Sequence, residues 1–99
     1  MIHVIAIITA TAGNRDKLLN EFKAVVPLVH EENGCIEYQP VTDADESSSQ
    51  SKIGPDSYMV IEKWKSMDNL RAHAASSHMV EYGERVAHLV ADRAVYVLN

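Results

Sequence analysis

The residues best suited to chemistry in this sequence are two histidines, His73 and His78, that flank a pair of serines. A free histidine titrates near pH 6.5, so it can act as a base or an acid at neutral pH. The apolar spacing predicts that His73 faces inward with Leu70 on a short helix, and that His78 lies at the margin of the apolar face of a longer helix. From spacing alone, a structural interpretation is slightly favoured over a catalytic one: one histidine caps a helix, and the other is a hydrogen-bonded residue at the edge of the core.

Glu62 and Trp64 alternate with outward-facing residues in a strand-like run, so they share one face with Tyr58. If that face meets the helices, Glu62 is a carboxylate beside apolar walls, where burial raises the pKa unless a cation or donor compensates. A pair with a histidine, or with Arg71 or Arg85, is the structural alternative. Trp64 is first a core aromatic and second a wall on which a flat ligand could stack.

Motifs for metals, phosphates and nucleophilic serines are absent from the sequence. It contains no HExxH, no paired CxxC and no GxSxG, and its four glycines are isolated. The single cysteine, Cys35, has no partner for an internal disulfide, which fits a reducing compartment. We therefore expect a cytoplasmic protein that uses no metal and no cofactor.

Length and charge restrict the possible partners. The 99 residues predict a single domain spanning 1–99, with 46% hydrophobic and 23% charged residues, as in ordinary globular proteins. The net charge is −5 and the nine basic residues are scattered, which argues against nucleic-acid binding. No apolar run approaches the length of a membrane span, and no basic segment precedes the first apolar run, which argues against a secretory signal. We expect a small molecule, or a second copy of the chain, as partner.

The elements that must position these side chains follow from apolar periodicity and from helix and turn signals. The predicted strands span residues 2–11, 35–42, 58–65 and 93–98, and the predicted helices span 14–32, 67–75 and 78–90. Ser66 is the expected cap of the second helix, and Gly34 the left-handed residue after the first. The serine-rich segment 43–57 is either a solvated hairpin loop or a lid over a site.

This order, β-α-β-β-α-β, predicts an α+β domain with a ferredoxin-like antiparallel sheet and helices on one face. The first and third strands carry apolar residues on both sides, so the second face of the sheet also needs a cover. In so short a chain, the most economical cover is the sheet of a second copy, which predicts a symmetric homodimer.

An ordered set of short motifs resembles the antibiotic biosynthesis monooxygenase family over essentially the whole chain. The set comprises Glu32-Asn33-Gly34-Cys35 with Tyr38, Glu62-Lys63-Trp64, Leu70-Arg71-Ala72-His73 and Ser77-His78-Met79. Val26-Pro27, Pro55-Asp56-Ser57 and the run MVIEKW look most like its bacterial quinol monooxygenase branch. Each motif is weak alone, whereas the ordered set is fairly specific for the family.

The resemblance implies a homodimeric α+β barrel without metal, flavin or haem, in which each subunit oxidises a hydroquinone or related phenol with O₂ in an apolar pocket. The substrate supplies the electrons, so the protein deprotonates and positions it. His73, His78 and Glu62 are then the catalytic candidates: the histidines as base and hydrogen-bond partner, without deciding which is the base, and Glu62 to orient a histidine or hold an arginine. The substrate-binding candidates are Trp64 as a wall, the hydroxyl groups of Tyr38, Tyr58 and Tyr82, and Met79 on the apolar face of the last helix.

Two other functions remain open. A His–Glu pair can move a proton between carbon atoms without O₂, so an isomerase of a small signalling metabolite is possible, and it would work equally well under argon. A fold does not fix its function, so the chain could also be a non-catalytic dimer that binds a hydrophobic ligand. Such a module would bind a quinone without turnover above spontaneous autoxidation.

Overall fold

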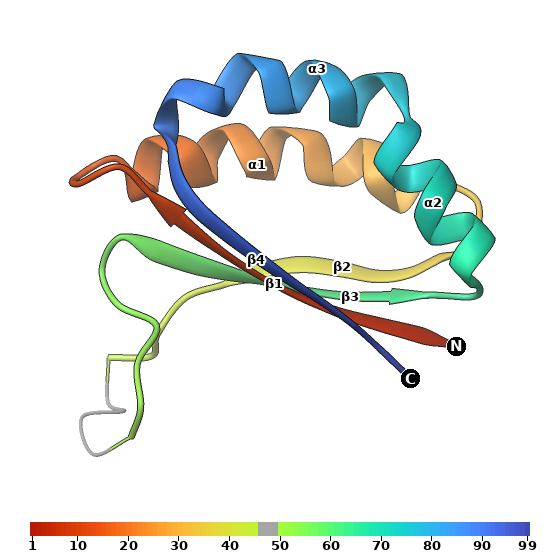
Figure 1. Cartoon of the computed structure of the whole chain (residues 1–99), viewed down its shortest axis with the longest axis horizontal. Coiled ribbons are helices and arrows are strands. Elements are labelled where there is room, and N and C mark those ends of the chain that lie inside the picture. The colour runs from red at the N-terminus through yellow and green to blue at the C-terminus, as the bar shows by residue number, and fades with distance from the viewer. Residues whose placement is uncertain (46–49) are drawn as a thin grey trace.

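A computed structural model describes residues 1–45 and 50–99 (Figure 1). The elements follow in the order β1 (Ile2–Ala10), α1 (Arg15–His30), β2 (Cys35–Val41), β3 (Ser57–Trp64), α2 (Met67–Ala75), α3 (Ser77–Val86), the 3₁₀ turn η1 (Ala87–Leu89) and β4 (Val90–Leu98). Residues 46–49, in the middle of the segment for which a hairpin loop or a lid is predicted, lie outside the described residues. None of the described helices is both long enough and apolar enough to span a lipid bilayer.

The strands form one antiparallel sheet in the order β2-β3-β1-β4. Helices α1 and α3 lie together over one face of this sheet, and α2 lies across one end of it (Figure 1). The predicted ferredoxin-like α+β architecture with helices on one face is therefore confirmed. β2 is an edge strand, which is where Pro40, lacking a backbone N–H, is tolerated.

Alternation along the strands separates the two faces of the sheet. On the two central strands, the side chains that face the helices are buried, including Val4, Ala6 and Ile8 on β1 and Val60 on β3. They pack against Leu18, Phe22, Val25 and Val29, which repeat on one face of α1 at helical spacing. The intervening strand residues are only half-buried and face away from the helices. The hydrophobic core of the described residues therefore lies between the sheet and α1 with α3.

The last helix is shorter than the sequence predicts. Apolar spacing predicts a helix to residue 90 and a strand from 93, whereas α3 ends at Val86 and β4 already begins at Val90. The 3₁₀ turn buries Leu89, and Val90 pairs with Ala10 of β1. Leu89 and Val90 continue the helical spacing, but pairing with β1 determines their backbone conformation.

Candidate active site

A cavity of about 680 Å³ lies between the sheet and the helices, a size typical of small-molecule sites. It is lined by residues from every strand, from all three helices and from the 3₁₀ turn. Most of the lining is aliphatic or aromatic. The lining residues that carry a polar group are Tyr38, Tyr58, Glu62, His73, Tyr82 and Arg93.

The floor of the cavity consists of three rows of side chains across β3, β1 and β4. Strand register gives the rows Tyr58–Ile8–Arg93, Val60–Ala6–Val95 and Glu62–Val4–Val97. The middle row is apolar and has its smallest side chain, Ala6, at its centre. Tyr58 and Glu62 are four residues apart on β3, so their Cα atoms are roughly 13 Å apart. The floor is therefore apolar in the middle and polar at two opposite ends.

Two histidines share one carboxylate beside the cavity. His73 Nδ1 lies 3.0 Å from Glu32 Oε2, and His78 Nε2 lies 2.7 Å from the same oxygen. The His73 and Glu32 side chains are 8% and 13% exposed, whereas that of His78 is 25% exposed. The cluster therefore runs from the cavity, which His73 lines, toward the protein surface.

The carboxylate determines which nitrogen of His73 can act as a base. An ionised carboxylate only accepts hydrogen bonds, so Nδ1 of His73 carries the proton and donates it to Glu32. In the neutral ring, Nε2 then keeps its lone pair. Among the described residues, Nε2 has no hydrogen-bond partner. Every buried side-chain nitrogen or oxygen there does have a partner, so an atom without one is not buried. Nε2 is therefore accessible, and it belongs to a ring that lines the cavity.

The break between α2 and α3 brings the two histidines together. Ser76 is extended (φ −64°, ψ 147°), which ends α2 and starts α3 in a new direction. Its hydroxyl group donates to the carbonyl oxygen of His73, at 2.7 Å. The single hydroxyl proton is thus used, so Ser76 Oγ can only accept from His78 Nε2, at 3.3 Å. His78 Nε2–H is accordingly a donor to both Glu32 and Ser76.

Glu62 lines the cavity, but its hydrogen bond goes to Trp64 rather than to a histidine or an arginine. Trp64 Nε1 donates to Glu62 Oε1 at 3.0 Å. Burial raises the pKa of the Glu62 carboxyl group, while the Trp64 donor and the positive charge of Arg93 act in the opposite direction. Arg71 and Arg85, the arginines considered from the sequence, pair with Asp68 and Glu21 instead.

Trp64 is fully buried and is not among the cavity-lining residues. Its ring packs against His73, with centroids 4.7 Å apart, and against the edge of Tyr38 at 6.4 Å. The His73 and Tyr38 rings, both of which line the cavity, lie 5.2 Å apart. Trp64 thus supports the rings that line the cavity from behind.

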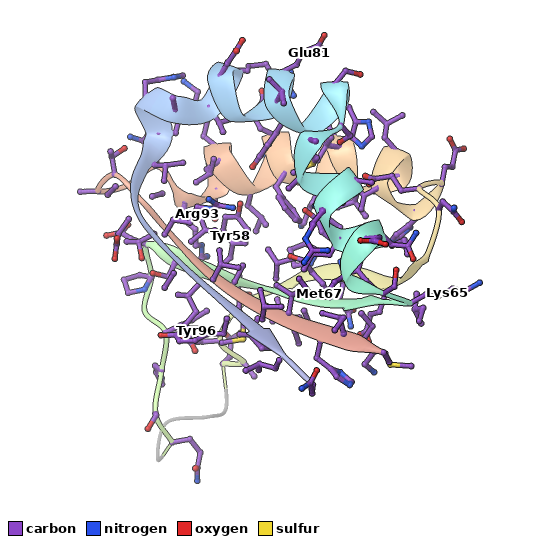
Figure 2. All side chains as sticks on the ribbon, turned by 45° about the vertical axis from the view of Figure 1, so that its right-hand side comes forward. Tyr58, Lys65, Met67, Glu81, Arg93 and Tyr96 are labelled. Carbon is purple, nitrogen blue, oxygen red and sulfur yellow. The ribbon has the colours of Figure 1, made fainter. Side chains whose placement is uncertain are left out.

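The three tyrosines considered from the sequence, and Met79, all line the cavity. Tyr58 and Tyr82 bring their hydroxyl oxygens to 3.4 Å of each other, beside the ring of Phe22. Burial raises the pKa of Tyr38, Tyr58 and Tyr82, so their hydroxyl groups stay protonated and can donate to a ligand oxygen. Tyr58 projects into the space between the sheet and the helices (Figure 2).

Two residues of this site were missed in the sequence. Arg93 lines the cavity from β4, although the sequence indicates only a position in the last strand. Glu32 follows the end of α1 and lies 41 residues from His73 in the chain. A signal for Glu32 does exist: an acidic residue after a helix C-terminus opposes the helix dipole, so its position calls for another reason.

The geometry suits proton transfer from a flat, largely apolar ligand. His73 offers an accessible base, Glu32 fixes which of its nitrogens carries the proton, and mostly apolar side chains line the space beside it. Within residues 1–45 and 50–99, no cluster of three or more His, Cys, Asp or Glu side chains is arranged to hold a metal ion.

Known proteins resemble this chain over most or all of its length. The model of the antibiotic biosynthesis monooxygenase family matches residues 1–85. The Escherichia coli (strain K12) protein named "Probable quinol monooxygenase YgiN" is 36% identical over 101 residues, covering 100% of this chain and 97% of that protein.

Solved structures share the fold. PA3566 of Pseudomonas aeruginosa superposes with a TM-score of 0.81 at 25% identity, covering 98% of this chain and 90% of the other. A structure described as an antibiotic biosynthesis monooxygenase superposes with a TM-score of 0.81 at 23% identity, covering 100% and 97%. The family resemblance seen in the sequence is thus confirmed, and this chain belongs to the antibiotic biosynthesis monooxygenase family.

Proposed function

We propose that this protein is a cofactor-independent monooxygenase that oxidises a hydroquinone or related phenol with O₂, with His73 as the base. The observation that carries the proposal is the accessible Nε2 of His73, opposite a nitrogen fixed by Glu32, in a mostly apolar cavity. The relative named as a quinol monooxygenase supports the choice of substrate class.

In this mechanism the aromatic ring lies over the apolar middle row, above Ala6, with one hydroxyl group at His73. Nε2 takes the phenolic proton, and the Glu32 carboxylate stabilises the imidazolium that forms. The resulting aromatic anion is a far stronger reductant toward O₂ than the neutral quinol. The substrate supplies all four electrons: one oxygen atom of O₂ enters the ring, the other leaves as water, and the diol becomes a hydroxyquinone. In this proposal, the hydroxyl groups of the tyrosines that line the cavity donate to the developing carbonyl oxygens.

Oxygen uptake tests this function directly. Metal-free protein is mixed with naphthalene-1,4-diol, with superoxide dismutase and catalase present and with autoxidation subtracted. We expect protein-dependent uptake that saturates with substrate. A positioned general base contributes roughly 10²–10⁴-fold, so His73→Asn is expected to lower kcat by that factor in a protein that remains folded.

The outcomes separate this function from its alternatives. Uptake equal to the blank across a panel of quinols would overturn the proposal. Proton exchange into a bound ligand at the same rate under argon would favour an isomerase, and quinone binding without turnover would favour a binding module. Full activity of His73→Asn would remove the role assigned to His73.

We also propose that the protein works as a homodimer whose subunits meet through the face of the sheet that the helices leave bare. That face carries Ile5, Ile7, Met59 and Ile61, which are half-buried in one subunit, and Tyr96, which is 53% exposed. Tyr96 lies on the side of the sheet opposite the helices (Figure 2). In a dimer with two-fold symmetry, the same face of each subunit meets its copy, so the apolar side chains of the two faces cover each other.

A further inference from the structure

We propose that Arg93, with the hydroxyl groups of Tyr58 and Tyr82, forms a carboxylate subsite at one end of the cavity, so that the preferred ligand is an aromatic acid rather than a neutral ring. Only the statement that such a ligand is turned over rests on the proposed function. The subsite itself is a statement about binding.

Strand register places the cation in the cavity. Arg93 pairs with Ile8 of β1, which pairs on its other side with Tyr58 of β3, so the three form one row on the helix-facing side of the sheet. Neighbouring strands are about 4.8 Å apart, which leaves roughly 10 Å between the Cα atoms of Arg93 and Tyr58. The arginine side chain is long enough for its guanidinium group to cover much of this distance. Figure 2 shows both residues between the sheet and the helices.

Arg93 has no anionic partner in the structure. Among the described residues, no carboxylate lies within ion-pair distance of its guanidinium group, whereas Arg15, Arg71 and Arg85 each have one. Within residues 1–45 and 50–99, Arg93 is also the only Lys or Arg that lines the cavity. A cation left unpaired at the edge of an apolar cavity is available to a ligand anion.

Tyr58, in the same row as Arg93, brings two hydroxyl donors to this end of the cavity, its own and that of Tyr82. The Tyr58 and Tyr82 hydroxyl groups are 3.4 Å apart, and one shared bond leaves a hydroxyl proton free to turn toward a ligand. A planar guanidinium beside a hydroxyl donor matches the two oxygens of a carboxylate better than a single carbonyl oxygen.

The opposite end of the cavity sets the orientation of the ligand. Glu62 stands two rows away from Arg93, and His73 lies against Trp64 next to Glu62 along the strand face. Arg93 attracts a ligand anion and an ionised Glu62 repels it, so the anion favours the Arg93 end even though the Arg93 charge also acts on Glu62. The reacting hydroxyl group then points toward His73, in the orientation that deprotonation needs.

Binding of a matched pair of unreactive ligands tests the subsite. Naphthalene-2-carboxylate and its neutral analogue naphthalene-2-carboxamide are titrated into the protein by calorimetry under argon. We expect the carboxylate to bind about tenfold more tightly, since a charge-assisted bond is worth that factor or more. Added NaCl should reduce the preference, because Arg93 is a solvent-exposed residue at the edge of the cavity.

Two variants locate the charge. Arg93→Gln should abolish the preference for the carboxylate and leave the carboxamide affinity unchanged. Arg71→Gln removes the same charge from an exposed pair on α2, outside the cavity, and should bind both ligands as the wild type does.

The subsite is overturned if wild-type protein binds the two ligands equally, if it binds no carboxylate at millimolar concentration, or if Arg93→Gln weakens both ligands alike. Oxygen uptake with neutral naphthalene-1,4-diol keeps the two proposals distinguishable. Uptake without a carboxylate preference removes the subsite alone, and a carboxylate preference without uptake from any quinol removes the oxygenase function alone.

Discussion

Glu32 connects the two histidines, and its effect on catalysis differs from that of the residues that touch a ligand. It accepts from His73 Nδ1 and His78 Nε2 but is not among the residues that line the cavity. Glu32→Gln replaces a pure acceptor with a group that can also donate, so the tautomer of His73 is no longer fixed. We expect kcat to fall by about 10²-fold or more while KM changes little, measured by steady-state oxygen uptake.

The neighbouring residue supplies the control for this variant. Glu31 is exposed and carries the same charge at the same end of α1. Glu31→Gln should therefore keep wild-type kcat. A Glu32→Gln enzyme with normal kcat, or one impaired only in KM, would contradict the positioning role of Glu32.

Glu62 makes stability depend on pH. Burial raises the pKa of its carboxyl group above the ordinary 4.5, so the folded protein holds this proton at pH values where the unfolded chain has released it. Stability is then lost as pH rises from 4.5 through the folded pKa. Glu62→Gln can still accept from Trp64 Nε1 and has no charge to bury. Its free energy of unfolding in urea, relative to wild type, should increase between pH 4.5 and pH 8; a difference that is constant or larger in acid would contradict this.

Elements with local signals were predicted accurately. α2 spans the predicted Met67–Ala75 because Ser66 caps it through its side chain, which accepts from Asn69 N–H at 3.2 Å. The face shared by Tyr58, Glu62 and Trp64 followed from strict alternation. The end of α3 was wrong because strand pairing, a long-range contact, overrides the helical spacing there.

Prediction of the site was limited by contacts between distant parts of the chain. The inward orientation of His73 followed from helix geometry, and the structure buries it. Its pairing with Glu32 joins the end of α1 to α2, and nothing local distinguishes Glu32 from Glu31. Trp64 shares the correct strand face, yet the rings of Tyr38 and His73 line the cavity while Trp64 does not. Only tertiary packing decides which aromatic of a cluster reaches a cavity.

The close packing of the α1–β2 turn against α2 depends on Gly34. This residue has φ +82°, as predicted for the position after α1, and a Cβ placed on it would collide with the Asn69 side chain. Asn69 belongs to the capping contacts of α2, the helix that carries His73. Gly34→Ala should therefore destabilise the protein by more than the ~1–2 kcal/mol that left-handed backbone alone costs an L-residue.

Gly13 is the matched control for this effect. Its φ is +80°, but a Cβ there meets nothing within 4 Å. Gly13→Ala should show the backbone effect alone, so the two variants, melted at equal protein concentration, should differ in Tm by several degrees. Equal Tm values would show that the contact with Asn69 carries no energy.

At the scale of the whole molecule, the sheet has two faces with different tasks. One face forms the cavity floor, and the other presents apolar side chains that this chain leaves only half covered. β4 belongs to both surfaces, because Val95 and Val97 line the cavity and Tyr96 faces the other way. On the bare face of this strand, Tyr96 and Leu98 are 53% and 47% exposed, and an exposed apolar edge strand of this kind calls for a cover.

A second copy of the chain is the cover proposed for that face, and a single charge tests it. Tyr96→Glu puts two carboxylates into a two-fold interface, where burying an unpaired charge is expensive. We expect light scattering after gel filtration to give twice the chain mass of 11.0 kDa for the wild type and the chain mass for Tyr96→Glu. Val80→Glu adds the same charge at a residue of α3 that is 49% exposed, and it should stay dimeric. A monomeric wild type, or a Tyr96→Glu dimer as stable to dilution as the wild type, would show that the bare face is not the interface.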